Sequence, residues 1–451
     1  MMPTMNRRQA LQMLGCGFGA VGLASAVEQQ PHFTPKAKQV IFLFLNGGMS
    51  QVDTFDPKTE LTRLHGKPLP GTKLPTDSAT GNLMASPFKF SRCGQSGLEV
   101  SEIFPKVGAL IDHFAVVRSC YADSSNHGPS LLLMNTGHAL SGRPSMGSWI
   151  TYGLGTINRN LPGFIALCPG YPVMGPNLWS SGFLPNAYQA TYVPNSERTP
   201  DKLVQNIRNA SLTIDDQQRQ LALLDRLNKL YLARSENQPK LAEGVQAMEV
   251  AFRMQMEAPE AFDLDRESAP TRERYGDDNF GRGCLLARRL VERGVRMVQV
   301  YFGDSQPWDS HEDINSHRGL SRIADAAISS LVEDLKSRGL FDSTLLIVGS
   351  EFGRTPMIQS AGQLRINNGR DHNVHGFTTL LAGGGIKGGI AYGATDDFGY
   401  RAVEKRVHPH DLQATILHQL GLDHTRLTYR YSGRDFRLTD VAGKVIDGIL
   451  A

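Results

Sequence analysis

The sequence predicts an α/β fold with a doubly wound, mostly parallel β-sheet, helices on both faces and a helical insertion. Short, continuous apolar runs such as KQVIFLFL (residues 38–45) are typical of strands that are buried on both sides. In the C-terminal half, such runs alternate with helical patterns, which favours parallel strand–helix–strand units. The 451 residues, 40% of them hydrophobic, suffice for one large domain with insertions.

The N-terminal half contributes the first strands and a short helix. The strand over residues 38–45 ends at Asn46, and a second short strand is expected at Ala115–Val117. Residues 127–137 read HGPSLLLMNTG, in which Pro129 suits the first turn of a helix and Gly137 suits its end. We therefore expect a helix over residues 129–136, with a histidine just before it.

The middle of the chain is expected to form an insertion, residues 201–281, within a single domain that spans residues 27–451. Residues 201–260 are rich in Leu, Ala, Gln, Glu and Arg, and their apolar residues recur at helical spacing. Residues 262–281 are polar and are expected to form a loop.

The C-terminal half alternates helices and strands. Leu286 and Leu290 share one helix face, and Gly294 can end that helix. Apolar residues at helical spacing predict a further helix over residues 320–335, which Gly339 can end. The remaining expected elements are strands at Val295–Phe302, Thr344–Ser350 and Phe377–Gly385 and a last helix at Asp411–Leu420.

Residues 1–26 are expected to be an export signal and not part of the fold. Arg7 and Arg8 precede a weakly apolar Gly/Ala-rich stretch, and Ala24-Ser25-Ala26 offers a cleavage site of small residues. This arrangement resembles a twin-arginine signal, which implies a periplasmic or cell-surface protein. A lipoprotein-like cleavage box at residues 13–16 and a short buried helix are the alternative interpretations.

Charge and cysteine content exclude some classes of protein. The net charge of +3 arises from 47 basic and 44 acidic residues, a balance that speaks against a nucleic-acid binder. After the signal, no stretch is long and apolar enough to span a bilayer. The cysteines outside the signal match no zinc pattern, and export would permit one or two disulfides, although Cys284 equally suits a buried thiol.

Acidic, amide and histidine side chains gather where predicted strands end or begin, and the carboxyl ends of parallel strands are where sites form. Mixed oxygen and nitrogen ligands suit Zn²⁺, Mn²⁺ or Mg²⁺, and with more oxygens Ca²⁺. Solvated loop residues and helix caps are the alternative reading. The candidates are Asp53, Asp309, His311, Glu351, Asp371, His372 and His375.

Two arginines stand beside these candidates. Arg354 and Arg370 could each grip a phosphate or sulfate with a forked guanidinium, or could serve as an ion-pair partner, which we favour for Arg370. Because a helix N-terminus attracts anions, the position of His127 also suits a sulfate or phosphate.

Several stretches resemble the DUF1501 family, a set of exported, sulfatase-like proteins within the alkaline phosphatase superfamily. The resemblance runs from about Lys38 to the C-terminus and is weakest in the insertion. It implies an alkaline phosphatase-like α/β fold. The matching stretches are VIFLFLNGGMSQVDTFDP, the segment from Asn126 to Gly137, CLLARRLVERGVRMVQV, WDSH, SEFGRTP, GRDH and LLAGGGIKGG.

The wider resemblance implies roles for single residues. Sulfatases carry a nucleophile at the head of a C-x-P-S-R-x-x-L-L-T-G motif, where this chain has His127, and Leu131 replaces the arginine. Glu351 takes the place of a metal-binding aspartate, and Phe352 replaces the neighbouring histidine. His372 resembles the late metal-binding histidine and Asp309 with His311 the middle pair, whereas Asn46 stands where relatives have a ligand aspartate and Asp53 is a substitute.

The expected function is that of an exported, metal-dependent hydrolase of phosphate or sulfate esters that lacks the usual sulfatase nucleophile. The attacker would be Ser124, Ser125, Ser130, His127 or a metal-bound water. The substrate would be a small anionic ester or a sulfated or phosphorylated polysaccharide. The alternative is an inactive member of the fold that binds a polysaccharide, an anion or a partner protein. The expected residues are Asp53, Asp309, His311, Glu351 and His372 for the metal and His127, Ser130 and Arg354 for catalysis.

Overall fold

The computed structural model of the protein describes residues 31–158, 160–204, 257–360 and 368–451, with a few positions between 213 and 227. The expected export signal at residues 1–26 and most of the expected insertion at residues 201–281 lie outside the described residues.

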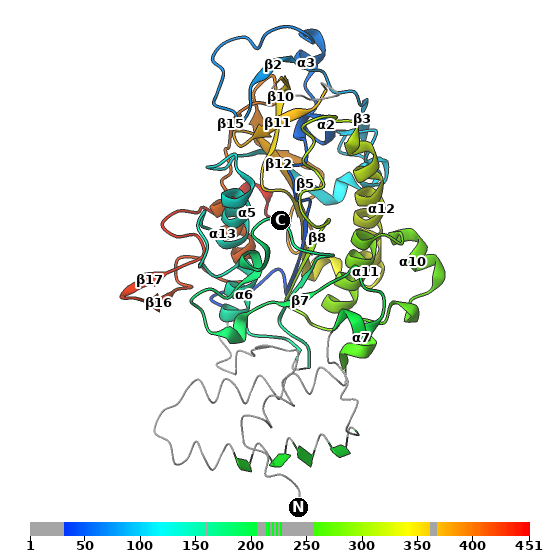
Figure 1. The fold of residues 1–451 in the computed structure, drawn as a ribbon, viewed down its shortest axis with the longest axis vertical. Helices are drawn as coiled ribbons and strands as arrows, with labels where there is room; N and C mark the ends of the chain where they lie inside the picture. Colours follow the sequence, from blue (N-terminus) through cyan, green and yellow to red (C-terminus); the bar gives the residue numbers. More distant parts are fainter. Residues whose placement is uncertain are drawn as a thin grey trace, which may run out of the picture.

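An eight-stranded sheet forms the centre of the molecule (Figure 1). Its strands follow the order β13-β5-β12-β9-β1-β8-β6-β7, and every neighbouring pair is parallel except the two pairs made by β12. The predicted mostly parallel sheet is therefore confirmed. The strands are β1 (Gln39–Phe44), β5 (Phe114–Cys120), β6 (Phe164–Leu167), β7 (Thr191–Val193), β8 (Met297–Tyr301), β9 (Thr344–Gly349), β12 (Phe377–Ala382) and β13 (Ile390–Tyr392).

Strand β1 lies in the middle of the sheet and is buried throughout. Ile41 pairs with Val298 of β8 on one side and with Leu346 of β9 on the other. Alternate residues of β1 belong to two different hydrophobic cores, one on each face of the sheet. This double burial explains why the strand is an unbroken apolar run in the sequence.

Helices cover both faces of the sheet, as Figure 1 shows. The face reached by Leu43 packs against α4 (Pro105–Ala109), α11 (Asn279–Glu292) and α12 (Ser316–Ser337). The face reached by Phe42 packs against α5 (His127–Thr136), α6 (Met146–Leu154) and α13 (Pro409–Gln419). A doubly wound architecture with helices on two faces is thereby confirmed.

Helix α5 begins two residues before the predicted start. The side chain of Asn126 accepts a hydrogen bond from the Gly128 backbone at 3.0 Å, which caps the helix and draws His127 into its first turn. At the other end, Gly137 adopts a φ of 70°, as expected for a glycine that ends a helix.

The polar stretch at residues 262–281, expected to be a loop, contains a helix. Helix α10 (Ala269–Tyr275) is capped by Ser268, whose side chain accepts from the Thr271 backbone. The helix buries Tyr275 while most of its other residues stay accessible, so its composition looks like that of a loop. The loop prediction was wrong there.

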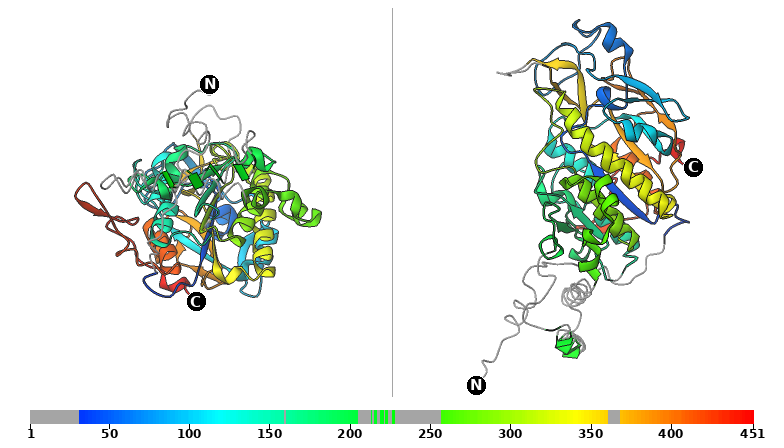
Figure 2. Two further views of the ribbon diagram at one scale, coloured as in Figure 1. Left: turned by 90° about the horizontal axis from the view of Figure 1, so that it is seen from below. Right: turned by 90° about the vertical axis from the view of Figure 1, so that its right-hand side faces the viewer.

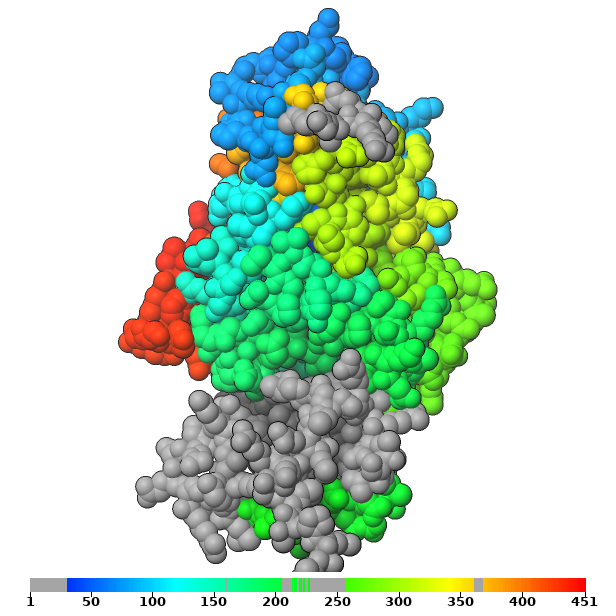
Figure 3. All heavy atoms as spheres, in the orientation of Figure 1, coloured from blue at the N-terminus to red at the C-terminus, as the bar shows by residue number. Residues whose placement is uncertain are grey.

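A second, three-stranded sheet lies beyond the carboxyl ends of the main parallel strands (Figure 1). It joins β2 (Thr80–Leu83), β10 (Gly353–Gln359) and β11 (Arg370–Asn373). The segment around β2 forms the top of the molecule, blue in Figure 3. This small sheet carries two of the predicted site residues, Arg354 and His372.

The remaining elements are peripheral. Hairpin β16–β17 projects from the side of the body (Figure 2). The other pairs are β3 (Phe90–Cys93) with β4 (Leu98–Ser101), β14 (Ala394–Thr395) with β15 (Ala402–Glu404), and β16 (Tyr429–Tyr431) with β17 (Arg434–Phe436). Short helices are α2 (Gln51–Thr54), α3 (Thr59–Arg63) and α7 (Pro200–Leu203), with 3₁₀ turns at Ile111–His113, Gly175–Trp179, Asn186–Tyr188, Leu264–Arg266, Phe341–Ser343 and Asp447–Ile449.

Two sequence expectations concern cysteines and membranes. Cys93, Cys120, Cys168 and Cys284 are all free thiols, so the disulfides that export would permit are not formed among the described residues. Cys284 is fully buried, as the alternative interpretation held. Within the same described ranges, no helix has both the length and the apolar character needed to cross a bilayer.

The turn after β1 approaches the loop after β8 very closely. Gly47 has a φ of 118°, and a Cβ atom on it would lie 2.6 Å from the backbone nitrogen of Asp309. Only a glycine therefore lets these two loops meet.

We expect Gly47→Ala to destabilise the protein more than the control Gly71→Ala. Gly71 also has a positive φ of 83°, but a Cβ atom there meets nothing within 4 Å. Both changes carry a backbone strain of about 1–2 kcal/mol. Overlap at Gly47 adds roughly 1–3 kcal/mol to the loss in unfolding free energy. Urea denaturation of the two variants measures the difference, and equal losses would contradict the close approach.

Candidate metal centre

The direction of β12 explains how the candidate residues come together. Loops that follow β1, β8 and β9 leave the sheet at its carboxyl edge, which is the usual place for a site. Strand β12 runs antiparallel to β9, so the residues before it reach the same edge. The segment 370–376 and the start of α5 thereby face the loops that carry Asp309 and Glu351.

Asp309, His311 and His372 meet at one point. The Oδ1 atom of Asp309 lies 2.8 Å from Nε2 of His311 and 3.1 Å from Nε2 of His372. The two Nε2 atoms are 2.9 Å apart. Three potential ligand atoms therefore surround one small volume.

The protonation of His372 follows from its other ring nitrogen. Its Nδ1 atom lies 2.7 Å from the carbonyl oxygen of Ser125 and 3.0 Å from Oδ2 of Asp77. Both oxygens accept hydrogen bonds, so Nδ1 carries the proton. The Nε2 atom faces Asp309 and His311, where the neutral ring would present a lone pair and the protonated ring an N–H donor.

The same argument applies to His311. Its Nδ1 atom contacts the side-chain amide oxygen of Gln359, which accepts a hydrogen bond. In its neutral form the ring of His311 would therefore also carry a lone pair at Nε2. Two Nε2 atoms and a carboxylate oxygen face each other, an arrangement that ring protons or a bound cation would stabilise. Their mutual separations suit one ion held at about 2.0–2.2 Å from each ligand atom.

His127 contacts the other carboxylate oxygen of Asp309 and lies beside His372, with ring centres 4.4 Å apart. Its Nδ1 atom is 2.8 Å from Oε1 of Glu351, and its Nε2 atom is 3.3 Å from Oδ2 of Asp309. Burial opposes the charged form, but the contacts with Asp309 and Glu351 outweigh it and raise the pKa of His127 to about 9. With Asp309 and His372, it forms another group whose ligand atoms all lie within 4.8 Å.

The expected anion site at the start of α5 has few free donors. Asn126 accepts from the Gly128 backbone through its side chain and from the Ser130 backbone through its carbonyl group. Pro129 has no N–H group. An anion at the first turn would therefore meet the helix dipole and the His127 ring, and few free backbone N–H groups.

Glu351 is a buried partner of His127 at the edge of the centre. Its carboxylate accepts from the Gly47 backbone at 2.9 Å and from the Ser350 hydroxyl at 2.8 Å, besides contacting His127. The side chain is fully buried and belongs to neither of the two described groups that could hold an ion. The structure thus places Glu351 as a partner of His127, apart from the lone pairs of His311 and His372.

Asp309 is held ionised by its surroundings. Burial favours its neutral form, but His127, His311, His372 and Arg354 together outweigh that effect and hold the pKa of the Asp309 carboxyl well below its usual range. The carboxylate is therefore available as an anionic ligand.

Arg354 does not reach into the open side of the centre. The guanidinium is fully buried and donates to the carbonyl oxygens of Gly48 at 2.9 Å, Arg370 at 3.2 Å and Trp308 at 3.3 Å, and also to Gly47. The Nη2 atom, which also contacts the Gly47 and Trp308 carbonyl oxygens, lies 2.6 Å from Oδ1 of Asp309. The donors that could bind an anion are thus already used within the protein.

Asp53 and Ser130 are also placed away from the lone pairs. Asp53 forms a fully buried ion pair with Arg370, whose Nε atom is 2.7 Å from Oδ2. The ion-pair interpretation of Arg370 therefore fits, although the pair is buried. Ser130 is buried on α5 and donates its hydroxyl to the carbonyl oxygen of Ser124.

The other candidates differ in their surroundings. Asn46 donates to the carbonyl oxygens of Gly303 and Ser305 and so connects the β1 and β8 loops. Asp371 accepts from the Ser78 backbone and lies 3.9 Å from Nδ1 of His311, and with His311 and His372 it forms a group whose ligand atoms all lie within 4.8 Å. The His375 ring lies outside both groups, with Nε2 3.4 Å from the Pro75 carbonyl oxygen and its ring edge-on to Tyr400.

Three supporting residues were missed by the sequence interpretation. Asp77 and Gln359 orient His372 and His311, but nothing in the sequence marks them because they come from unrelated segments. His317 accepts from the Ser50 backbone and contacts the Ser310 hydroxyl at 3.0 Å. Burial lowers the pKa of His317 to about 3, so it stays neutral and holds the loop between Asp309 and His311.

The chain resembles other proteins in sequence and in fold. No curated protein matches it. A sulfatase from Pseudoalteromonas sp. is 12% identical over 86% of this chain and 68% of its own, with a TM-score of 0.36. The lipoteichoic acid synthase LtaP from Listeria monocytogenes is 9% identical over 96% of this chain and 80% of its own, with a TM-score of 0.36. An alkaline phosphatase superfamily protein from Vibrio parahaemolyticus is 10% identical over 93% of this chain and 76% of its own, with a TM-score of 0.35.

Structural similarities at such low sequence identity do not assign an activity. A family model described as "Protein of unknown function (DUF1501)" matches residues 37–450 of the chain. That range includes every strand of the central sheet and every residue of the candidate metal centre. The chain therefore belongs to the DUF1501 family.

Proposed function

We propose that the protein is a divalent-metal-dependent hydrolase of phosphate or sulfate esters. The proposal rests on one observation, the convergence of the Nε2 atoms of His311 and His372 on the carboxylate of Asp309. The partners at Nδ1 orient both rings so that, when neutral, each offers its Nε2 lone pair to an ion. The family resemblance to sulfatase-like proteins supports the ester class.

The ligand set narrows the choice of metal. Two imidazole nitrogens and a carboxylate oxygen suit Zn²⁺, Mn²⁺ or Fe²⁺ better than Mg²⁺ or Ca²⁺, which prefer oxygen ligands. When bound, such an ion supplies Lewis-acid activation of water and of the ester oxygens. The side chains that Asp77 and Gln359 orient would hold it.

His127 is the side chain best placed to move a proton. Its ring lies between two carboxylates, with Nδ1 on Glu351 and Nε2 facing Asp309 at the edge of the centre. A positioned imidazole of this kind acts as a general acid or base towards a leaving oxygen or a water. Glu351 would keep the ring in place and balance its charge.

The N-terminal sequence supports an extracytoplasmic site of action. The twin-arginine pattern at Arg7 and Arg8 would direct the protein to the periplasm or the cell surface. Anionic esters and sulfated or phosphorylated polysaccharides are the substrate classes that we propose there.

A second function is binding of a metal ion and an anionic polymer without turnover. It is favoured by the surroundings of one hydroxyl group and one guanidinium group, both of which are already engaged within the protein. Ser130 donates to the Ser124 carbonyl oxygen, and Arg354 is committed to backbone carbonyls and Asp309. A protein that binds metal at the centre but hydrolyses neither aryl phosphate nor aryl sulfate would support this second function.

We expect His372→Ala to lose the bound divalent metal and with it the hydrolysis of aryl esters. Loss of an orienting partner alone typically weakens metal affinity 10–100-fold, and removal of a ligand should weaken it by at least about 100-fold. Plasma emission spectrometry of the purified variant measures the metal. His375→Ala is the matched control, because His375 lies three positions along the chain and outside the cluster. Equal metal content in both variants would contradict the ligand assignment.

Chelation should lower the thermal stability of the wild-type protein. An ion present at 100 times its dissociation constant stabilises the folded state by about 2.7 kcal/mol. Removing it with a chelator should therefore lower Tm, and adding Zn²⁺ or Mn²⁺ back should restore it. The same treatment should leave the Tm of His372→Ala unchanged. A wild-type Tm that is insensitive to chelator and metal would count against a metal centre.

His127→Ala should slow turnover more than it changes metal content. Loss of a general acid or base typically lowers kcat by about 10²–10⁴-fold, and His127 is not one of the two rings whose lone pairs converge. Steady-state kinetics with aryl phosphate and aryl sulfate, beside metal analysis, measure both effects. His113→Ala, which removes a ring bound to Lys336 far from the cluster, is the control. Unchanged kcat in His127→Ala would leave His127 as a turn residue.

A further inference from the structure

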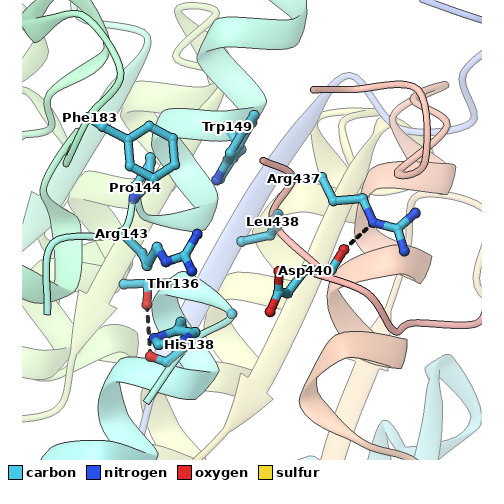
Figure 4. Close-up of a pocket in the computed structure, with 10 residues that line it drawn as sticks. Thr136, His138, Arg143, Pro144, Trp149, Phe183, Arg437, Leu438 and Asp440 are labelled. Atoms are coloured by element: carbon cyan, nitrogen blue, oxygen red, sulfur yellow. Dashed lines mark hydrogen bonds between the residues drawn. The ribbon is translucent and has the colours of Figure 1, made fainter. Parts of the chain in front are cut away.

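A second pocket opens at the far end of α5 (Figure 4). It is a shallow hollow whose roughly 200 Å³ includes open solvent, and its enclosed part has room for about one water molecule, so a larger bound group would lie at its mouth. Helix α5 begins at His127 in the metal centre and ends beside this pocket. The lining residues are Thr136, Gly137, His138, Arg143, Pro144, Trp149, Phe183, Arg437, Leu438 and Asp440.

Arg143 supplies a free cation to this pocket. Its guanidinium points into the space between Trp149 and Asp440 (Figure 4). The guanidinium carbon lies 4.3 Å from the centre of the Phe436 ring and 6.0 Å from that of Phe183. Throughout the part of the chain that the structure describes, it has no hydrogen-bond or ion-pair partner. A guanidinium stacked on a ring keeps the N–H groups at its edge available for an oxyanion.

His138 adds a neutral donor. Its Nδ1 atom accepts a hydrogen bond from the Leu140 backbone at 3.1 Å. The neutral ring must then carry its proton on Nε2, for which no described residue is a partner. His138 and Arg143 thus supply donors from two sides of the same space.

The one carboxylate in the pocket is already paired. Asp440 forms an ion pair with Arg434 of the projecting hairpin, and its backbone carbonyl accepts from Nε of Arg437. Three arginines therefore surround a single carboxylate. The excess positive charge makes the pocket attractive for an anion and unattractive for a cation.

We propose that this pocket binds a sulfate or phosphate group carried by a sugar unit of a polysaccharide. The free guanidinium of Arg143 and the ring N–H group of His138 match the oxyanion. The partly exposed Phe183 ring, which packs edge-on against the buried Trp149, provides an apolar wall for the sugar. The polymer would be the substrate class of the proposed hydrolase, so the identity of the polymer rests on the proposed function.

Helix α5 sets the separation between the pocket and the metal centre. Its 10 residues join His127 to Thr136, and a rise of 1.5 Å per residue makes this separation roughly 14 Å. A single sugar cannot contact both ends. A polymer with regularly spaced anionic groups could occupy the pocket with one group and the metal centre with another.

The test measures binding in place of turnover, on the full chain carrying His372→Ala so that the metal centre does not contribute. The probes are dextran sulfate, dextran phosphate, unmodified dextran and sodium sulfate, titrated by calorimetry at low ionic strength. We expect binding of one or both charged dextrans and none of unmodified dextran. The better-bound charged dextran identifies the ester type.

Arg143→Gln should weaken charged-dextran binding about tenfold, because a charge-assisted bond is lost. Arg143→Lys should weaken it less, since charge remains but the fork does not. Arg430→Gln is the matched control, because Arg430 is an exposed arginine of the β16–β17 hairpin that does not line the pocket and pairs with Asp435 at 3.2 Å. Its binding should stay within twofold of the parent, and thermal melting checks that all variants fold.

Three results would overturn the pocket assignment. These are equal affinity in Arg143→Gln and Arg430→Gln, equal binding of charged and unmodified dextran, and binding of sodium sulfate with no binding of either charged polymer. The two proposals fail separately. Absence of ester turnover in the metal-loaded wild type, with intact Arg143-dependent binding, removes the hydrolase alone. Normal turnover with lost polymer binding removes the pocket alone.

Discussion

The arrangement of the centre depends on one buried charge, the guanidinium of Arg354. A fully buried cation needs a complete set of partners, and this one finds them on three separate segments of the chain. It joins the turn after β1 through Gly48, the loop after β8 through Asp309, and strand β11 through the Arg370 carbonyl. Loss of any one loop from its place would leave donors unsatisfied. The loops that carry the metal ligands are thereby fixed relative to one another.

Much of the fold could be predicted because its strands are buried on both faces. Strands such as β1 and β9 must be apolar throughout, and their runs stand out in the sequence. The edge strand β13 and the short strands β6 and β7 give no such signal, because three or four residues are too few for a pattern. The antiparallel direction of β12 was not predicted either, although it brings His372 to the metal centre.

The sequence indicated several of the residues that gather at the candidate site, but it indicated much less about the role of each residue. Asp309, His311 and His372 were singled out by their position at strand edges, and the structure brings them together. Asp53 and Arg354 occupy equally suggestive positions, but both are fully buried and already paired, Asp53 with Arg370 and Arg354 with Asp309. Pairing of this kind depends on contacts between segments about 300 residues apart in the case of Asp53 with Arg370, which no local pattern records.

The Phe352 ring covers one side of the centre. The ring is fully buried, and its centre lies 4.4 Å from that of His372 and 4.9 Å from that of His127. This side of the cluster is closed by hydrocarbon, while Asp309 and His311 keep about a quarter of their side-chain surface accessible (26% and 25%). Among the described residues, this carboxylate–imidazole edge is the most accessible part of the cluster. In the proposed hydrolase a substrate would therefore approach from the side opposite the Phe352 ring, and a smaller side chain at that position would leave the buried side of the cluster less well shielded from solvent.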